Sequence, residues 1–180
     1  SMDITNFTDS LLIQTNSDGS APTTGTLSSA TGNIGIGKNT FTALTSGDYN
    51  TAIGDTAGGG LTTGIGNTFL GKTAGELVSS GNYNIGVGYD AVGGRATTGS
   101  HNIGLGYYAC DKVTSGGNNI ALGENCMLGG TDMTGNGNIA MGETAAVNIV
   151  SGDHNIMVGY QAGNALTTAN KNVILGYQAG

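Results

Sequence analysis

The chain has 180 residues, a net charge of −7 and only 9% charged residues, against about 25% in an ordinary globular protein. Its five basic residues are scattered (Lys38, Lys72, Arg95, Lys112 and Lys171), which excludes the basic patch that nucleic-acid binding requires. No apolar run approaches the ~20 residues of a membrane-spanning helix, so we expect no membrane insertion. Gly accounts for 35 residues but Pro for only one, which excludes a collagen triplet.

Residues 1–28 do not follow the pattern of the rest of the chain. We interpret Ser1-Met2 as a cloning remnant, and we find no signal peptide. The single apolar run is Leu11-Leu12-Ile13, followed by a polar loop. Because terminal units of repeat proteins are usually atypical, we predict that residues 1–28 form a capping segment with one strand.

Residues 29–180 form a repeat array with a period close to 17 residues. An Asn begins each unit and a Gly follows it four residues later. The successive spacings are 17, 17, 17, 18, 17, 19, 17 and 17 residues. The members are Asn33, Asn50, Asn67, Asn84, Asn102, Asn119, Asn138, Asn155 and Asn172, with Gly37, Gly54, Gly71, Gly88, Gly106, Gly123, Gly142, Gly159 and Gly176. Such regularity predicts a solenoid, and because the chain ends in mid-unit we expect the array to continue beyond Gly180.

A coil of about 17 residues is too short for a strand–helix–strand unit, which needs ~30 residues. A Ser/Thr-Gly pair precedes seven of the nine Asn residues, from Ser46-Gly47 to Ser151-Gly152, and we predict a turn there in which Gly adopts positive φ. The sequence therefore predicts an all-β parallel solenoid of about nine coils, with two strands of roughly five residues in each coil.

The Asn column is predicted to be structural. Identical Asn side chains one strand spacing apart can form a ladder of amide hydrogen bonds. Asn also tolerates the left-handed backbone conformation better than most residues. Both properties favour a structural function for these residues over ligand binding.

Further positions repeat after the Gly. A small residue, usually Ala, lies three residues later and an aliphatic residue seven residues later, as in Ala57 and Leu61. In the two longer coils we expect surface loops near Gly93-Gly94 and Gly129-Gly130, with Ala96 and Asp132 at the aliphatic position. Cys110 and Cys126 are predicted to be buried free thiols, since strand alternation would point them to opposite faces.

The strand after most of the Asn residues is apolar at three successive positions, as in Ile120-Ala121-Leu122. A strand that is apolar on both faces is usually buried on both faces. A thin coil has only one interior, so the other face requires a partner. We predict a parallel homotrimer around an apolar axis, because closed symmetry is the usual form of self-association.

Two segments carry a family resemblance. The unit Ser/Thr-Gly-x-x-Asn-Ile-Ala-Ile/Leu-Gly-x-x-Ala, seen from Ser115 to Gly123 and from Thr134 to Ala145, resembles the head repeats of YadA-type trimeric autotransporter adhesins. The stretch Val173 to Gly180 resembles repeat arrays of phage tail-fibre and tail-spike proteins. The resemblance covers residues ~29 to 180. It implies a left-handed trimeric β-roll, an adhesive rod, other fibre segments as partners, and a location on a virion or alternatively on a bacterial surface.

Enzymatic alternatives are weaker. Hexapeptide acyltransferases carry three hexads per coil, whereas only one, such as Ile53 to Ala57, fits here. His101 and His154 precede the repeat Asn at a variable position that we expect to face solvent. Asp55, Glu124 and Glu143 share the position after the repeat Gly, and we interpret this column as a solvated edge although glycoside hydrolysis uses paired carboxylates. We predict no enzyme activity, no metal and no cofactor.

Tyrosines provide the one hint of a ligand. Tyr89, Tyr107, Tyr160 and Tyr177 occupy the position after the repeat Gly, with Tyr108 beside them. Exposed aromatic rings can stack on sugars, so Tyr89, Tyr107, Tyr108 and Tyr160 are candidate glycan contacts. The alternative is that the rings simply pack along the edge of the array.

The sequence thus favours a structural or adhesive segment of a trimeric fibre that binds a cell-surface glycan or protein receptor. An ice-binding solenoid is the alternative from another class. Such a protein would require a strict Thr-x-Thr column, whereas Thr here clusters in turns, as at Thr62-Thr63, and is replaced by Ser in other coils.

Overall fold

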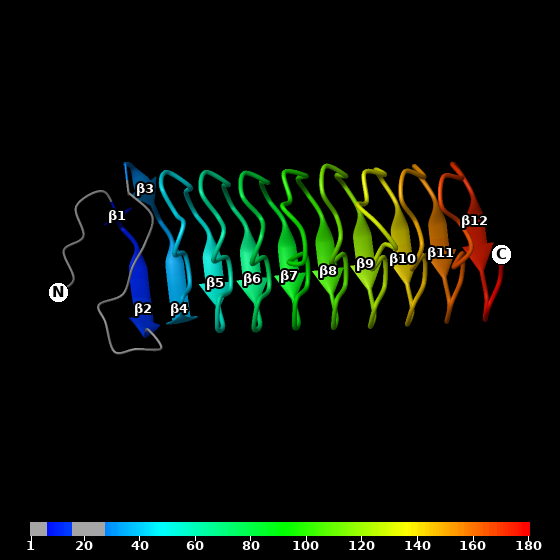
Figure 1. The fold of residues 1–180 in the computed structure, drawn as a ribbon, viewed down its shortest axis with the longest axis horizontal. Coiled ribbons are helices and arrows are strands. Elements are labelled where there is room, and N and C mark those ends of the chain that lie inside the picture. The colour runs from blue at the N-terminus through cyan, green and yellow to red at the C-terminus, as the bar shows by residue number, and fades with distance from the viewer. Residues whose placement is uncertain (1–6, 16–27) are drawn as a thin grey trace.

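A computed structural model describes residues 7–15 and 28–180 and confirms an all-β parallel solenoid. Residues 1–6, which include Ser1-Met2, and residues 16–27 lie outside the described residues. Within the described part there is no helix, and so none that could cross a membrane. Figure 1 shows the coils stacked along one axis, with one strand of each coil on the near side.

A ten-stranded parallel sheet runs the length of the rod, in the order β2, β4 and then β5 to β12 (Figure 1). Neighbouring strands pair in register, so that Ile103 lies opposite Ile120 and Leu105 opposite Leu122. The nine repeat strands β4 to β12 enclose eight complete coils. The strands are β2 (Leu11–Thr15), β4 (Ile34–Lys38), β5 (Thr51–Ile53), β6 (Thr68–Leu70), β7 (Ile85–Val87), β8 (Ile103–Leu105), β9 (Ile120–Leu122), β10 (Ile139–Met141), β11 (Ile156–Val158) and β12 (Val173–Leu175), with a separate pair β1 (Phe7–Thr8) and β3 (Ala30–Thr31).

The prediction of two strands per coil is wrong for the described repeats, which have one named strand of three to five residues each. The returning half of each coil cannot be extended, because two positions after the repeat Gly adopt left-handed φ. Thr73 has φ 58° and Gly75 has φ 64° in the coil after Gly71. This half consists of turns, which still bond from coil to coil, as in Gly58 N–H to Ala74 O at 2.9 Å.

The predicted asparagine ladder is present and is fully buried from Asn33 to Asn155. Asn50 Nδ2 donates to Asn33 Oδ1 at 3.0 Å and to Gly64 O at 2.8 Å. Asn50 Oδ1 accepts from the backbone N–H of Asn67 at 2.8 Å and from its Nδ2 at 3.0 Å. Both donors and both acceptor directions of the amide are therefore satisfied without water.

The left-handed conformation falls on the residue before the Asn and not on the Asn itself, contrary to the prediction. Tyr49, Tyr83 and His101 have φ 57°, 55° and 61°, and no ladder Asn has positive φ. The Asn must remain extended because it leads directly into the strand. The preceding residue makes the turn that brings the chain into it.

The glycine of the Ser/Thr-Gly pair is also required for a different reason than predicted. Gly47 does not have positive φ. A Cβ on Gly47 would instead collide with Gly64 O, the carbonyl that accepts the ladder bond from Asn50. The repeat Gly does need positive φ, which is 142° at Gly54, and a Cβ there would also collide with the next coil.

The ladder extends one rung further than the sequence indicated. Ser10 Oγ accepts from the backbone N–H of Asn33 at 2.8 Å, in the manner of a ladder Asn. Asp9 before it has φ 52°, like the residue before each Asn, and Leu11 then begins β2. Ser10 therefore continues the Asn column into the first strand of the sheet, which pairs with β4.

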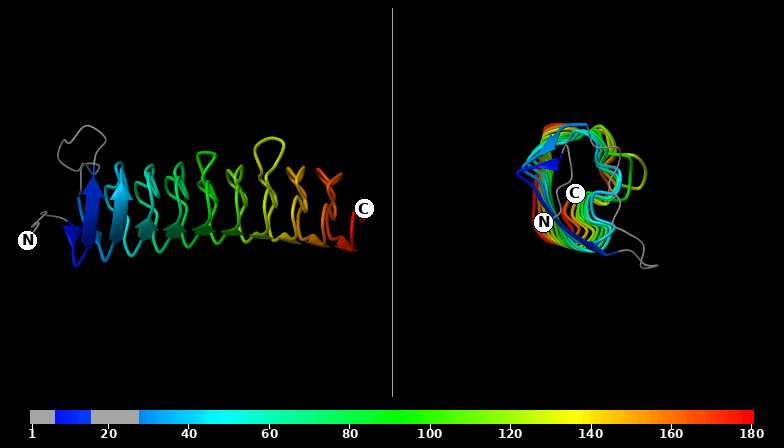
Figure 2. Two further views of the ribbon diagram at one scale, coloured as in Figure 1. Left: turned by 90° about the horizontal axis from the view of Figure 1, so that it is seen from below. Right: turned by 90° about the vertical axis from the view of Figure 1, so that its left-hand side faces the viewer.

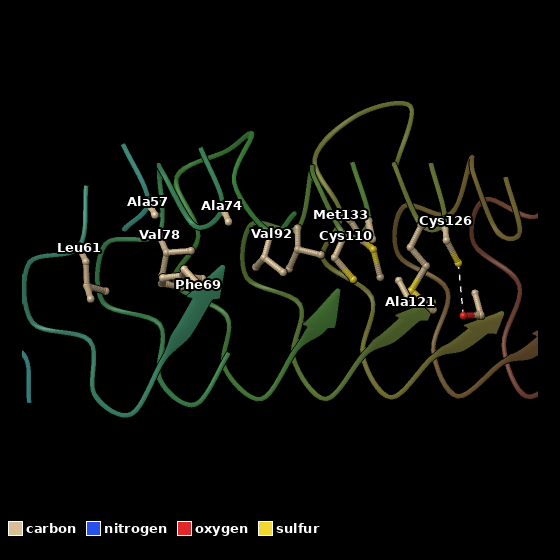
Figure 3. Close-up of a cluster of buried hydrophobic side chains, with 14 of the residues drawn as sticks. Ala57, Leu61, Phe69, Ala74, Val78, Val92, Cys110, Ala121, Cys126 and Met133 are labelled. Atoms are coloured by element: carbon tan, nitrogen blue, oxygen red, sulfur yellow. Dashed lines mark hydrogen bonds between the residues drawn. The ribbon is translucent and has the colours of Figure 1, made fainter. Parts of the chain in front are cut away.

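The core contains one inward residue from each strand and the small and aliphatic residues of the returning half (Figure 3). The inward strand residue is complementary in size to the residue six positions later: Phe69 meets Gly75 and Met157 meets Gly163, whereas Gly35 meets Phe41. A Cβ on Gly75 would lie 2.5 Å from the Phe69 ring. In these three coils the glycine makes room for the large side chain, so that a phenylalanine or methionine fits into the same narrow core.

In the two longer coils the buried position is one residue later than predicted. Thr97 and Met133 are fully buried and form bridges to Val78 and Val113, while Ala96 and Asp132 are exposed. The extra residues leave as loops and the chain returns to the core at the next available position. Figure 2 shows these two loops projecting from the side of the rod opposite the strands.

Cys110 and Cys126 are buried free thiols, as predicted. The reasoning from strand alternation is wrong, because both residues lie in the turns and both point into the core (Figure 3). Burial raises the pKa of the Cys126 thiol to about 12 and raises that of Cys110 as well. Both thiols are therefore protonated fillers near neutral pH.

The ladder predicts the outcome of a substitution at its centre. Asn119→Ala would leave the Asn138 N–H, one Asn138 Nδ2 hydrogen and Gly135 O without their partners. With about 1–3 kcal/mol for each unsatisfied buried group, we expect a loss of at least about 3 kcal/mol in the free energy of unfolding.

The matched control is Asn172→Ala at the last rung, which is only half-buried and should cost less than half as much. Urea denaturation of both variants at equal protein concentration measures the difference. Equal losses would show that the ladder does not carry the stability assigned to it.

Candidate functional site

The most extensive candidate site is the outward face of the ten-stranded sheet. In each repeat strand the middle residue points inward and its two neighbours point outward, as in Ile103, Gly104 and Leu105. The outward residues form two columns along the rod. The first contains Leu11, Ile34, Thr51, Thr68, Ile85, Ile103, Ile120, Ile139, Ile156 and Val173, and the second contains Ile13, Ile36, Ile53, Leu70, Val87, Leu105, Leu122, Met141, Val158 and Leu175.

These two columns, hereafter the apolar face, are uncovered in the single chain. Leu105 at mid-rod is 39% exposed and Ile34 near the start is 41% exposed. Only Thr51 and Thr68 interrupt the aliphatic side chains. Soluble monomers rarely expose a continuous apolar surface of this extent, and such surfaces usually mark a contact with another molecule.

The residues before each Asn form one border of the apolar face. Tyr49 and Tyr83 cover the glycines at the equivalent position of the preceding coil, Gly32 and Gly66. His101 stacks on Tyr83 with ring centroids 5.2 Å apart. His101 and His154 are exposed, as predicted for this column.

The residues after each repeat Gly form the opposite border. Tyr89 and Tyr107 stack at 5.2 Å, and Tyr108 meets the Tyr107 ring edge-on at 4.4 Å. A hydrogen bond to Tyr107 raises the pKa of Tyr108 to about 12. The structure thus brings Tyr89, Tyr107 and Tyr108 together, whereas Tyr160 lies in a separate pair with Tyr177.

This arrangement bears on how the tyrosines could bind a glycan. The facing surfaces of Tyr89 and Tyr107 are occupied by each other, and so are those of Tyr160 and Tyr177. A sugar could stack only on an outer ring face at the end of each pair. The stacked rings therefore fit the alternative of edge packing along the array at least as well as sugar binding.

The carboxylates after the repeat Gly do not form an enclosed site. Glu124 and Glu143 are exposed and Asp55 is half-buried. Across residues 7–15 and 28–180, no three His, Cys, Asp or Glu side chains come together in a group that could hold a metal ion.

The loops of the two longer coils form the second candidate site, which the sequence did not indicate beyond the presence of surface loops. Arg95 of the first loop and Asp132 of the second are joined by an ion pair, with Nε and Oδ1 3.4 Å apart. A hollow of about 490 Å³ is lined by Arg95, Gly130, Thr131 and Asp132. Only the spacings of 18 and 19 residues could have pointed to it.

Asp111 lies under the first loop, in the coil between the two loops. It is 5% exposed, and its Oδ1 is buried without a hydrogen-bond partner among the described residues. Burial raises the pKa of Asp111 to about 6, and the charge of Asp90 adds to the increase. Lys112, a backbone hydrogen bond from Gly94, and Arg95 oppose it.

Comparison with protein-family models, with curated proteins and with solved structures gives no significant match. The surfaces described above are therefore the basis for inferring what the chain does. They comprise an apolar face, two bordering columns rich in aromatic residues, and a polar hollow. The loops that line the hollow lie on the side of the rod opposite the strands (Figure 2).

The buried Asp111 predicts a pH dependence of stability. Its pKa in the folded chain is higher than the ordinary value of 3.8, so the folded state binds more protons than the unfolded state between pH 3.8 and about 6. Its contribution to stability is therefore lost as pH rises through this window. We expect Asp111→Asn to raise the free energy of unfolding at pH 7 by about 1–3 kcal/mol, and by less at pH 4.

Urea denaturation of the wild type and of Asp111→Asn at pH 4, 5, 6 and 7 measures this difference. The gap between the two proteins should widen as pH rises. A gap that stays constant with pH would contradict the assignment to ionisation of Asp111.

Proposed function

We propose that the chain is a non-enzymatic segment of a trimeric fibre, in which three parallel copies form a rod for attachment to a host or surface. The observation that carries the proposal is the apolar face, which extends over all ten strands of the sheet and is uncovered in one chain. The sequence resemblance to phage tail-fibre repeats favours a virion as its location.

The apolar face fits a parallel arrangement of identical chains. Its two columns are continuous, because every strand pairs in register with the next. A second copy that lies parallel and at the same height meets this face along its whole length. Around a threefold axis, the first column of each copy packs against the second column of its neighbour, and three such contacts close the ring.

The energetic reason for assembly is the small size of the core. Each repeat strand has one inward position, which is Gly in β4, β7 and β8, and all but β5 and β6 place two aliphatic side chains outside. Burial of one such side chain stabilises by ~1.5–3 kcal/mol. The outward columns together contain more aliphatic side chains than the strands place inside, so covering them is a substantial source of stability for the rod.

The polar surfaces complete the assignment. The inserted loops lie on the side away from the sheet (Figure 2). In a trimer with the apolar faces at the axis, these loops point outward to solvent, where a receptor can reach them. The proposed division is thus an apolar inner side for assembly and a polar outer side for attachment.

A charge on the apolar face tests the proposal. We expect the wild type to sediment as a trimer, and Leu105→Glu to dissociate into monomers or to lose most of its assembly, because three buried carboxylates would meet near the axis. The matched control is Leu77→Glu, since Leu77 is an exposed leucine (46%) outside the sheet. It should remain a trimer.

Sedimentation velocity over a range of concentrations distinguishes these states. A folded wild-type monomer would contradict the proposal. So would a dimer, or an equal effect of the two substitutions.

A further inference from the structure

The two longer coils carry their extra residues at the same position of the repeat, and residues from both inserted loops line the same hollow. The loops arise after the small core residues Ala91 and Cys126, in coils separated by one coil of ordinary length. At ~4.8 Å per coil their bases are ~10 Å apart. The Arg95–Asp132 ion pair spans this distance, so that the two loops border one open hollow on the surface and do not project independently.

The intervening coil forms the base beneath the loops. A Cβ on Gly129 would lie 3.3 Å from Lys112 Cβ, and a Cβ on Gly94 would collide with the Asp111 carboxylate. The glycines therefore allow both loops to lie directly on the coil between them. The backbone of this coil is fixed by the buried ladder, so the loops rest on a rigid support.

The lining of the hollow is polar and offers both donors and acceptors. Arg95 supplies a guanidinium, Asp132 a carboxylate and Thr131 a hydroxyl, while Gly130 leaves backbone accessible. The volume of about 490 Å³ falls within the about 300–1,000 Å³ of small-ligand sites. Arg95 and Asp132 are 49% and 63% exposed, and an exposed ion pair contributes only ~0–1 kcal/mol, so a ligand can displace it at little cost.

We propose that the hollow between residues 93–96 and 129–132 binds a neutral, hydroxyl-rich saccharide. Each sugar hydroxyl both donates and accepts hydrogen bonds, which matches a lining that presents a cation, a carboxylate and a hydroxyl side by side. An acidic sugar would be repelled by Asp132 and by the net charge of −7. This inference rests on the proposed function, and it assigns attachment to the outward loops in place of the tyrosine columns.

The experiment probes the fluorescently labelled full chain on an array of neutral, sialylated and uronate-containing glycans. We expect binding to neutral glycans, and a reduction of about tenfold or more in both Arg95→Ala and Asp132→Ala, the scale of a lost charge-assisted hydrogen bond. Lys171→Ala removes the same charge from an exposed residue outside the hollow and should bind like the wild type. Tyr107→Ala should also bind like the wild type.

Sedimentation velocity of every variant separates this inference from the proposed function. A trimer that binds no neutral glycan would overturn the saccharide site and leave the fibre proposal standing. Preference for acidic glycans, loss of binding in Tyr107→Ala alone, or full binding by both hollow variants would also overturn it. A monomeric wild type would contradict the fibre proposal whatever the array shows.

Discussion

The buried asparagine ladder is the interaction on which the rest of the structure depends. Most of the amides, such as that of Asn50, donate both to the preceding rung and to a carbonyl of the following coil, so the coils are fixed at one strand spacing and in one register. Because these amides are fully buried, a shift by even one residue would leave several polar groups without partners. The ladder also requires glycine at Gly47 and its equivalents, since a Cβ there would occupy the place of the accepting carbonyl.

The ladder has a direct consequence for the apolar residues. It fixes the first residue of each strand just after a buried Asn, so that the middle residue of the strand points inward and both neighbours point outward. A three-residue strand therefore exposes more aliphatic surface than it buries. The ladder satisfies its own hydrogen bonds but leaves the outward aliphatic side chains uncovered, and the proposed association with further copies would bury them.

The sequence was sufficient to predict what recurs in every coil. The period, the parallel stacking and the Asn ladder all follow from residue types at fixed spacing. It could not predict the returning half of the coil, because residues such as Thr73 and Tyr108 have no strong preference for left-handed φ and adopt it under the constraint of the turn. For the same reason the strand alternation applied to Cys110 and Cys126 did not hold, since neither lies in a strand.

The candidate sites, too, could be predicted from the sequence only in part. The apolar face was predictable from three successive apolar residues in most of the strands. The hollow was not, because it depends on where the inserted residues leave the core, and the buried positions proved to be Thr97 and Met133. Ser10 was missed because it replaces Asn at an irregular spacing of 23 residues before Asn33. Local irregularities of this kind are set by packing and not by composition.

The most direct test of the account is the register of the copies along the apolar face. Three chains are made: Ile34→Cys in the first outward column of β4, Ile36→Cys in the second column of β4, and Leu175→Cys in the second column of β12. The Ile34→Cys chain is mixed with each of the other two, refolded and oxidised, and the cross-linked peptides are identified by mass spectrometry. Because the first column of each copy packs against the second column of its neighbour, parallel copies in register predict links of residue 34 to residue 36. Links between residues 34 and 175, or no links at all, would contradict the account.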